Sequence, residues 1–490
     1  MTVKTRFAPS PTWYLHIGSL RTVLYNYLYA KQKKGQFMLR VEDTDRTRLV
    51  EDAIPNMLKI LEKFGMTPDE WPNSDLGNWP YVQSERLDIY QKYIKELIEK
   101  DEAYYCFCSS ERLTKLREEQ QSLWIPTKYD QNCRFMTKEE TQLKLDAGEK
   151  FTVRLKVPKD INVEFRDEVK WKISIPSKDV DDQVLLKTDG FPTYHFAVVV
   201  DDYLMKVTDI IRGDEWIPST PKHVLIYRAF GWEIPKISHI PPLIWANKKK
   251  LSKRDWDVAV EDYLKKGYLI EAIINYLALL GWNPKTTEEF FTMDELIERF
   301  DLSAVHKAGA FFDVERLDFF NAHYLKNTDI SELYKKYKRY LLEYDKEFLE
   351  TISQFDDDYN MKILSELNTR IKKFDELKEL TTYFYGEVKS PEDDLILNPK
   401  MKLETSDDVY KALNITLDIL KNKDWEFENT DEMKPIFIEK IKEAEMKNWQ
   451  VLWPTRCALS WEKFSPWAFE MIYILGREES IKRIEKYLNR

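Results

Sequence analysis

The sequence predicts an α/β fold of the Rossmann type, with an inserted α+β block and an all-helical C-terminal region. Residues 1–85 alternate between short apolar strands and helical runs, the pattern of a parallel nucleotide-binding sheet. Residues 151–176 contain short alternating strands that interrupt this pattern. From about residue 325, apolar residues recur at spacings of three and four among frequent Lys and Glu, which indicates helices.

The predicted elements follow from these periodicities. The first are a strand over Val3–Phe7, a helix over Leu20–Lys33, a strand over Gln36–Val41 and a helix over Ala53–Phe64. A longer helical run covers Ser84–Ala103. The sheet is expected to resume at Phe196–Asp202, because a continuous apolar run is typical of a buried parallel strand.

Length and charge limit the classes of function. A chain of 490 residues predicts two to four domains. No apolar stretch approaches the roughly 18 residues of a membrane span, and no secretory leader precedes the first strand, so a cytoplasmic protein without a membrane partner is expected. Because 75 basic and 85 acidic residues give a net charge of -10, a nucleic acid could be bound only through local basic clusters.

Two distant segments together predict a polyphosphate site. Residues 9–19 have the sequence PSPTWYLHIGS and connect a strand to a helix, which puts His16 and Gly18 at the turn. Backbone N–H groups and the positive end of the helix dipole face an anion at such a turn. Residues 250–254 have the sequence KLSKR, which places three cations within five positions.

These segments resemble the HIGH and KMSKS signatures of class I aminoacyl-tRNA synthetases. The runs RFAPSPT at 6–12, RVEDTDR at 40–46, TDGFPTYH at 188–195 and IRGDEW at 211–216 resemble the bacterial-type glutamyl-tRNA synthetase branch in particular. The resemblance covers nearly the whole chain. It implies a monomeric glutamate–tRNA ligase that uses ATP with Mg²⁺, L-glutamate and tRNA(Glu), and it leaves open whether tRNA(Gln) is also charged.

The resemblance also implies a division of the chain. Its five segments are the first half of a Rossmann-like catalytic domain (1–85), an inserted acceptor-end-binding domain (86–190), the second half of the catalytic domain (191–245), the KMSKS-like loop with stem-contact helices (246–325) and a helical anticodon-binding region (326–490). The helical tail disfavours a glutaminyl enzyme, whose tail is a β-barrel. Its presence disfavours a glutamyl-queuosine enzyme, which lacks that third of the chain.

Adenylate formation needs positioning and neutralisation of negative charge and no covalent nucleophile. The resemblance therefore assigns His16 to the ATP phosphates and Lys253 to the leaving pyrophosphate, as the catalytic pair. A histidine at a helix start is, taken alone, more often only a cap. The implied ATP-binding residues are Pro9, Ser10, Thr12, His16, Gly18, Ser19, Lys250, Ser252, Lys253 and Arg254.

A glutamate substrate carries two carboxylates, so its site needs at least one cation, and a bidentate guanidinium suits it. Arg6 and Arg212 match the substrate arginines of the family, and Glu42 matches the residue that holds the α-ammonium group. The other implied glutamate-binding residues are Ala8, Ser10 and Tyr194. The alternative for Arg6 is a surface strand residue. In the helical region, Arg370 is a weaker candidate for contact with the anticodon.

Three cysteines in the inserted block resemble the zinc-binding insertion of some glutamyl enzymes. Cys106, Cys108 and Cys133 could supply three tetrahedral thiolate ligands. Phe135 stands where such proteins often have the fourth ligand, a histidine. Tyr129, four residues before Cys133, resembles a tyrosine variant in the related glutamyl-queuosine enzymes. A metal-free block with buried free cysteines is the alternative.

The chain has 13 glycines and 15 tryptophans, which is anomalous for a protein of this length. Four tryptophans stand where the family pattern has glycine: Trp13, Trp256, Trp461 and Trp467. Six more stand in similar sequence contexts: Trp71, Trp79, Trp124, Trp171, Trp245 and Trp449. The hypothesis is that the source organism decodes UGA as glycine. If Trp13 is genuine, its indole fills space that a nucleotide needs, and the second function is a catalytically silent tRNA-binding paralogue.

Overall fold

The computed structural model describes residues 2–11, 14–44, 50, 52–74, 76–244, 259–386, 393–422, 427, 429–462 and 465–489. Thr12, Lys250, Ser252, Lys253, Arg254, Trp13, Trp245 and Trp256 lie outside the described residues. The chain forms two compact units, Met1–Asp262 with Ile270–Val314 and Tyr263–Leu269 with Glu315–Arg490.

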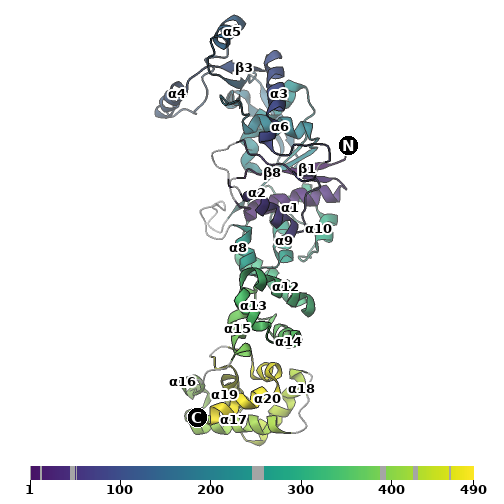
Figure 1. Ribbon diagram of the computed structural model, residues 1–490, viewed down its shortest axis with the longest axis vertical. Coiled ribbons are helices and arrows are strands. Elements are labelled where there is room, and N and C mark those ends of the chain that lie inside the picture. Colours follow the sequence, from purple (N-terminus) through teal and green to yellow (C-terminus); the bar gives the residue numbers. More distant parts are fainter. Residues whose placement is uncertain are drawn as a thin grey trace. The chain divides into compact units, whose positions relative to one another are not determined.

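Parallel strands form the centre of the first unit (Figure 1). β1 (Lys4–Phe7) pairs with β2 (Gln36–Leu39), and β8 (Asp209–Gly213) pairs with β9 (Lys236–Ile240). The backbone N–H of Thr208 donates to the carbonyl of Lys4 at 3.0 Å, which brings the start of β8 beside β1. The Rossmann-type prediction is confirmed.

The helices of the first unit include α1 (Ile17–Gln32), α2 (Ala53–Lys63), α3 (Leu87–Glu99), α6 (Tyr194–Leu204), α7 (Thr220–Phe230), α9 (Ile270–Leu279) and α10 (Met293–Arg299). α1 packs against β1, β2 and β8, and α9 and α10 pack on α1. α1 places Leu20, Val23 and Leu24 in the core, each no more than 1% exposed. A short parallel pair, β10 (Leu243–Ile244) and β11 (Ala310–Phe311), completes the unit.

Two element predictions were wrong. Phe196–Asp202 belongs to helix α6 and not to a strand. All seven residues are buried, so the run lacks the polar face that would reveal a helical period. The helix predicted over Ser84–Ala103 is shorter: a 3₁₀ turn covers Gln83–Arg86, α3 ends at Glu99, and Ala103 begins a strand. The left-handed backbone of Asp101, with φ of 60°, ends that helix.

The inserted block is built on a three-stranded antiparallel sheet in the order β3 (Ala103–Cys106), β4 (Thr152–Leu155), β7 (Val184–Leu186). Between β3 and β4 lie α4 (Ser110–Ser122) and α5 (Lys138–Asp146), neither of which has a buried residue. A hairpin of β5 (Asn162–Asp167) and β6 (Trp171–Pro176) extends the central sheet instead, because β5 pairs with β9 at Ile237. The α+β prediction is confirmed.

The second unit is helical, as predicted. Its helices are α11 (Val314–Asn327), α12 (Ile330–Tyr344), α13 (Lys346–Ile352), α14 (Asp357–Leu367), α15 (Asp375–Tyr385), α16 (Asp393–Ile396), α17 (Ser406–Lys421), α18 (Thr430–Glu443), α19 (Asn448–Ser460) and α20 (Ala468–Leu488), and α8 (Val260–Lys265) spans the boundary between the units. α17 to α20 pack into one bundle (Figure 1). Among the described residues, no helix combines the length and apolar character needed to span a membrane.

Candidate active site

A cavity of about 480 Å³ lies where the strands β1 and β8 end. Ligands commonly bind at the carboxyl ends of parallel strands in folds of this type. Nine of the predicted site residues line the cavity: Arg6, Ala8, Pro9, Ser10, His16, Ser19, Glu42, Tyr194 and Arg212. The structure therefore gathers the described members of the predicted ATP and glutamate sets in one place, although their roles stay predictions.

His16 is the N-cap of α1, with extended backbone at φ -81° and ψ 145°. Its Nδ1 accepts a hydrogen bond from the backbone N–H of Gly18 at 2.9 Å. A Cβ at residue 18 would lie 3.1 Å from that nitrogen, so glycine leaves room for the imidazole. A neutral ring that accepts at Nδ1 carries its proton on Nε2. The histidine is thus a cap and also a lining residue of the cavity.

The described residues on both sides of 245–258 contact the start of α1. Ala259 pairs with His16 in an isolated β-bridge, and the backbone N–H of Val260 donates to the carbonyl of Leu15 at 3.0 Å. On the other side, the side chain of Leu243 is 4.0 Å from the position that a Cβ on Gly18 would occupy. Leu243, Ala259 and Val260, described residues on either side of the predicted cationic loop, therefore lie next to the start of α1.

Buried carboxylates pair with two arginines, and one member of each pair of partners, Arg6 and Glu42, lines the cavity. Asp202 accepts from Arg6 Nε at 3.2 Å and from Arg40 at 2.7 Å, and Arg40 also donates to Glu42 at 2.9 Å. Burial acts to raise the pKa of Asp202, but the two guanidinium groups hold it below its usual value. For Glu42 burial prevails over Arg40 and raises the pKa to about 7. Arg6 is only 4% exposed, so the surface-residue alternative is wrong.

Arg212 differs from these arginines because its recorded partners are neutral. Its Nε donates to His239 Nε2 at 3.2 Å, one terminal nitrogen donates to Thr220 Oγ1 at 2.9 Å, and both terminal nitrogens lie 3.2 Å from His223 Nδ1. Among the described residues, no carboxylate forms an ion pair with Arg212. Burial lowers the pKa of Arg212, and the carboxylate of Asp202 acts in the opposite direction from a distance. A buried guanidinium whose direct hydrogen-bond partners are neutral favours an incoming carboxylate.

Aromatic rings form one wall beside this guanidinium. The rings of Tyr194 and Trp216 lie 4.4 Å apart between centroids, and both residues line the cavity. Sequence reasoning missed Trp216 as a wall residue and also missed Arg40, Asp202, His223 and His239. For Asp202, two acids at the end of an otherwise apolar run were an available signal, whereas the histidines gave none.

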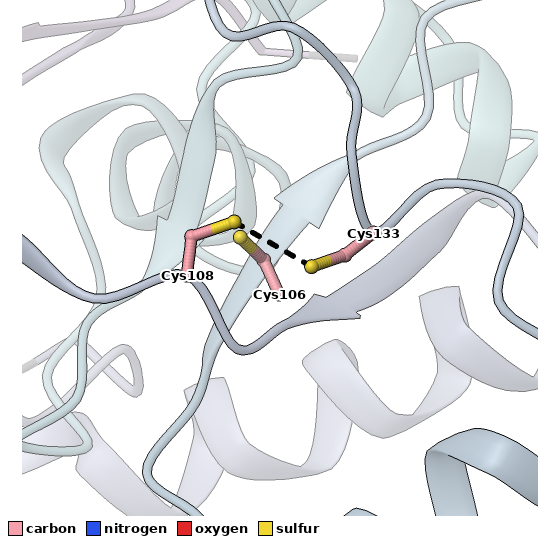
Figure 2. A group of neighbouring side chains, drawn as sticks. All are labelled: Cys106, Cys108 and Cys133. Carbon is pink, nitrogen blue, oxygen red and sulfur yellow. Dashed lines mark hydrogen bonds between the residues drawn. The ribbon is translucent and has the colours of Figure 1, made fainter. Parts of the chain in front are cut away.

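The predicted metal ligands also come together. The sulfur atoms of Cys106, Cys108 and Cys133 lie within 4.8 Å of one another, and those of Cys108 and Cys133 are 3.6 Å apart. Figure 2 shows the three side chains pointing toward one another from β3, the segment after it and a separate loop. The hydroxyl of Tyr129 lies 3.3 Å from Cys106 Sγ and 3.4 Å from Cys108 Sγ. The four predicted ligands form one cluster.

Arg370 belongs to the second unit. Its guanidinium forms an ion pair with Glu470 in the first turn of α20. The contact shows that Arg370 is positioned by a carboxylate, and its part in anticodon binding stays a prediction.

Comparison with known protein families identifies the family of this chain. The sequence pattern of "tRNA synthetases class I (E and Q), catalytic domain" matches residues 2–319. The chain belongs to this family. The pattern of an "Anticodon binding domain" matches residues 332–488, so this class I synthetase also carries the family's C-terminal module.

Relatives of this synthetase match over almost its full length. It is 44% identical to the glutamate–tRNA ligase of Clostridium tetani, across 99% of this chain and 96% of the relative, and 43% identical to that of Finegoldia magna, across 100% and 99%. A glutamate–tRNA ligase structure from Elizabethkingia meningosepticum superposes with a TM-score of 0.89 at 33% identity, covering 100% of this chain and 99% of that one. These relatives are named as ligases, so they give no support to the silent paralogue.

Proposed function

We propose that the protein is a glutamate–tRNA ligase, which activates L-glutamate with ATP to glutamyl-adenylate and transfers it to the 3′-terminal adenosine of tRNA(Glu). The observation that carries the proposal is the buried guanidinium of Arg212, which lines the cavity and has only neutral hydrogen-bond partners among the described residues. A glutamate side chain supplies that carboxylate. Glu42, at the same cavity, supplies the negative charge for the α-ammonium group.

ATP would bind with its phosphates at the start of α1. The first N–H groups of the helix and the Nε2 proton of His16 would face the phosphates there. Lys253, outside the described residues, would meet the leaving pyrophosphate, because the residues flanking its segment lie next to His16. Mg²⁺ would enter on the phosphates, where it keeps most of its waters and needs no protein cage.

Zinc fits the cluster of Cys106, Cys108, Cys133 and Tyr129. Zn–S bonds of about 2.3 Å place two tetrahedral sulfur ligands about 3.8 Å apart, close to the 3.6 Å between Cys108 and Cys133. The hydroxyl of Tyr129 is near enough to two sulfurs to be the fourth ligand. Zinc would hold β3 to the loop around residue 133. Metal analysis should find one zinc per chain, and well under one would contradict the site.

The helical second unit would contact the anticodon through unpaired bases, with Arg370 as one contact. We further propose that the ligase is a cytoplasmic monomer. Charging assays with tRNA(Glu) and tRNA(Gln), run on the chain with glycine at the ten suspect tryptophan positions, test the function and its range together. Glutamate transfer to tRNA(Glu) supports the proposal, transfer to tRNA(Gln) as well would extend it, and transfer to neither would refute it.

A further inference from the structure

Three adjacent parallel strands hold a hydrogen-bonded series of side chains behind the cavity. Arg212 on β8 lies directly opposite His239 on β9, and Asp167 is the last residue of β5 on the other side of β9. His239 Nδ1 lies 2.6 Å from Asp167 Oδ2, and its Nε2 lies 3.2 Å from Arg212 Nε. Asp167 is 1% exposed and His239 is fully buried.

The hydrogen bonds of this series allow one protonation pattern. Arg212 Nε can only donate, so His239 Nε2 must accept and carry no proton. The remaining ring proton is then on Nδ1, where the carboxylate of Asp167 accepts it. Burial lowers the pKa of His239, which favours this neutral ring. If the His239 proton were on Nε2, two donors, His239 Nε2–H and Arg212 Nε–H, would face each other and the guanidinium would be displaced.

The same logic applies on the other side of Arg212. His223 Nδ1 accepts from the terminal nitrogens, so the His223 proton is on Nε2, which lies 3.1 Å from His195 Nδ1. Burial also moves the pKa of His223 well below its usual value. Neutral acceptors on both sides therefore orient the guanidinium without neutralising its charge.

We propose that Asp167 and His239 are positioning residues for substrate recognition: they hold the Arg212 guanidinium so that its remaining N–H groups meet the side-chain carboxylate of glutamate. This inference rests on the proposed function. The physical advantage is that the arginine is held by an acceptor whose negative charge lies one side chain further away, so its attraction for a substrate carboxylate is preserved.

The substitution Asp167→Asn tests the tautomer directly. An asparagine oxygen can still accept from the backbone N–H groups of Val169 and Lys170, as Asp167 Oδ1 does at 2.9 and 2.7 Å. Its amide nitrogen replaces Oδ2, which also accepts the backbone N–H of His239 at 3.1 Å; this loss is the same whatever side chain residue 239 carries, so the comparison between the two backgrounds isolates the ring. The asparagine amide would donate to His239 Nδ1 and drive the ring proton onto Nε2. We expect the dissociation constant for glutamate to rise about tenfold or more. The KM for ATP should stay within about twofold, because the contacts proposed for ATP are untouched.

His239→Gln provides the conservative rescue, because its amide oxygen can accept from Arg212 Nε without help from Asp167. We expect glutamate binding within about threefold of the unsubstituted chain, whereas His239→Leu, which has no acceptor, should weaken it about tenfold or more. Adding Asp167→Asn to His239→Gln should then have little further effect. His306→Gln, at an exposed histidine, is the matched control.

Titration calorimetry with L-glutamate on the full chain separates the outcomes, with circular dichroism to confirm folding. The proposal is supported if Asp167→Asn weakens glutamate binding when residue 239 is histidine and does not weaken it when residue 239 is glutamine. Equal weakening in both backgrounds, or none in either, overturns it while leaving the proposed function intact. If the unsubstituted chain does not bind glutamate, the proposed function fails and this inference fails with it.

A second inference comes from the backbone of the tryptophans. Eleven described non-glycine residues have positive φ, and three of them are Trp124 (55°), Trp171 (74°) and Trp461 (60°). The other eight are Lys, Asp, Gln or Glu, so tryptophan is the one aromatic or apolar residue type among them. All three belong to the ten that the sequence places at glycine-like positions. Trp216, Trp232, Trp282 and Trp453, which do not, have no positive φ. Trp71, Trp79, Trp449 and Trp467 of the ten have none either, so the backbone argument applies to three positions only.

Trp124 shows what its position requires. Its N–H bonds to the carbonyl of Gln121 at 3.1 Å and that of Ile125 to Gln120 at 3.0 Å, the Schellman arrangement that ends a helix. Four other helices of this chain end in the same arrangement with Gly65, Gly148, Gly231 and Gly267, at φ of 67°, 71°, 73° and 84°. Four more end in it with the polar residues Lys34, Asp101, Lys206 and Glu445, so the position favours glycine or a polar residue and tryptophan is the exception. Trp461 likewise occupies the left-handed C-cap of α19.

We infer that the native protein has glycine at positions 124, 171 and 461, through decoding of UGA. Peptide mass mapping of the protein purified from its own source should find glycine at these positions, together with UGA in the gene. Tryptophan in the native peptides, or UGG codons there, would overturn the inference.

Discussion

Trp124→Gly should stabilise the chain, although it removes a large side chain. Trp124 is 95% exposed, so the substitution loses almost no apolar burial. Its φ of 55° lies in the left-handed region, which costs a residue with a Cβ roughly 1–2 kcal/mol. The extra freedom of glycine in the unfolded chain offsets about 0.5–1 kcal/mol of that gain. We expect a net stabilisation of about 0.5–1 kcal/mol.

Leu123→Gly is the matched control, one residue earlier in the same helix end. Leu123 is 69% exposed, but its φ is -89°, which an ordinary residue adopts without strain. Glycine there brings only the entropic cost, and we expect a loss of about 0.5–1 kcal/mol. Urea unfolding followed by far-ultraviolet circular dichroism compares the variants. Equal destabilisation by both substitutions would refute the backbone argument and weaken the case for native glycine.

Three further predictions concern the two sites. Arg212→Gln removes the buried cation and should weaken glutamate binding by about 3 kcal/mol, roughly a hundredfold. Arg212→Lys should not restore binding, because an ammonium group lacks the two parallel N–H donors of a guanidinium. Calorimetric binding by either variant near that of the unsubstituted chain would contradict this. Burial raises the pKa of Glu42 to about 7, so the side chain becomes protonated and loses its negative charge as the pH falls through that value. The dissociation constant for glutamate should therefore rise as the pH falls from 8 to about 6, approaching tenfold per pH unit below 7. Titrations at several pH values check this, and the slope should vanish in Glu42→Gln. Cys133→Ser removes one thiolate from the cluster and should lower the zinc content measured by mass spectrometry and also the thermal midpoint, whereas Cys457→Ser, which replaces a buried cysteine in the second unit, should leave the zinc content unchanged.

Local patterns predicted the turn that holds His16 and the presence of the helix after it. The helix predicted from Leu20 begins three residues earlier, at Ile17, with His16 as its N-cap. The sequence analysis missed the buried helix α6, because a segment that is buried on every side shows no helical period of apolar and polar residues. Thr193 was an available signal, because threonine is a preferred N-cap residue, although its side chain makes no capping bond here.

The candidate site was predictable only where a motif contained it. Arg6, Glu42 and Arg212 stand in recognisable runs, and the structure brings them to one cavity. Asp202 reaches Arg6 across 196 positions, and Asp167 reaches His239 across 72. Such pairs depend on which strands and helices become neighbours, and a sequence without an alignment carries no signal of that. In the sequence, Asp167 and His239 therefore looked like ordinary strand residues.

The most direct test of the account is glutamate-dependent and tRNA-dependent exchange of pyrophosphate into ATP, measured on the chain with glycine at the ten suspect positions. The account predicts exchange with L-glutamate and tRNA(Glu), and its loss in His16→Ala and in Arg212→Gln. Exchange that is absent from the folded glycine-containing chain, or that persists undiminished in both variants, would contradict the claim that this cavity activates glutamate.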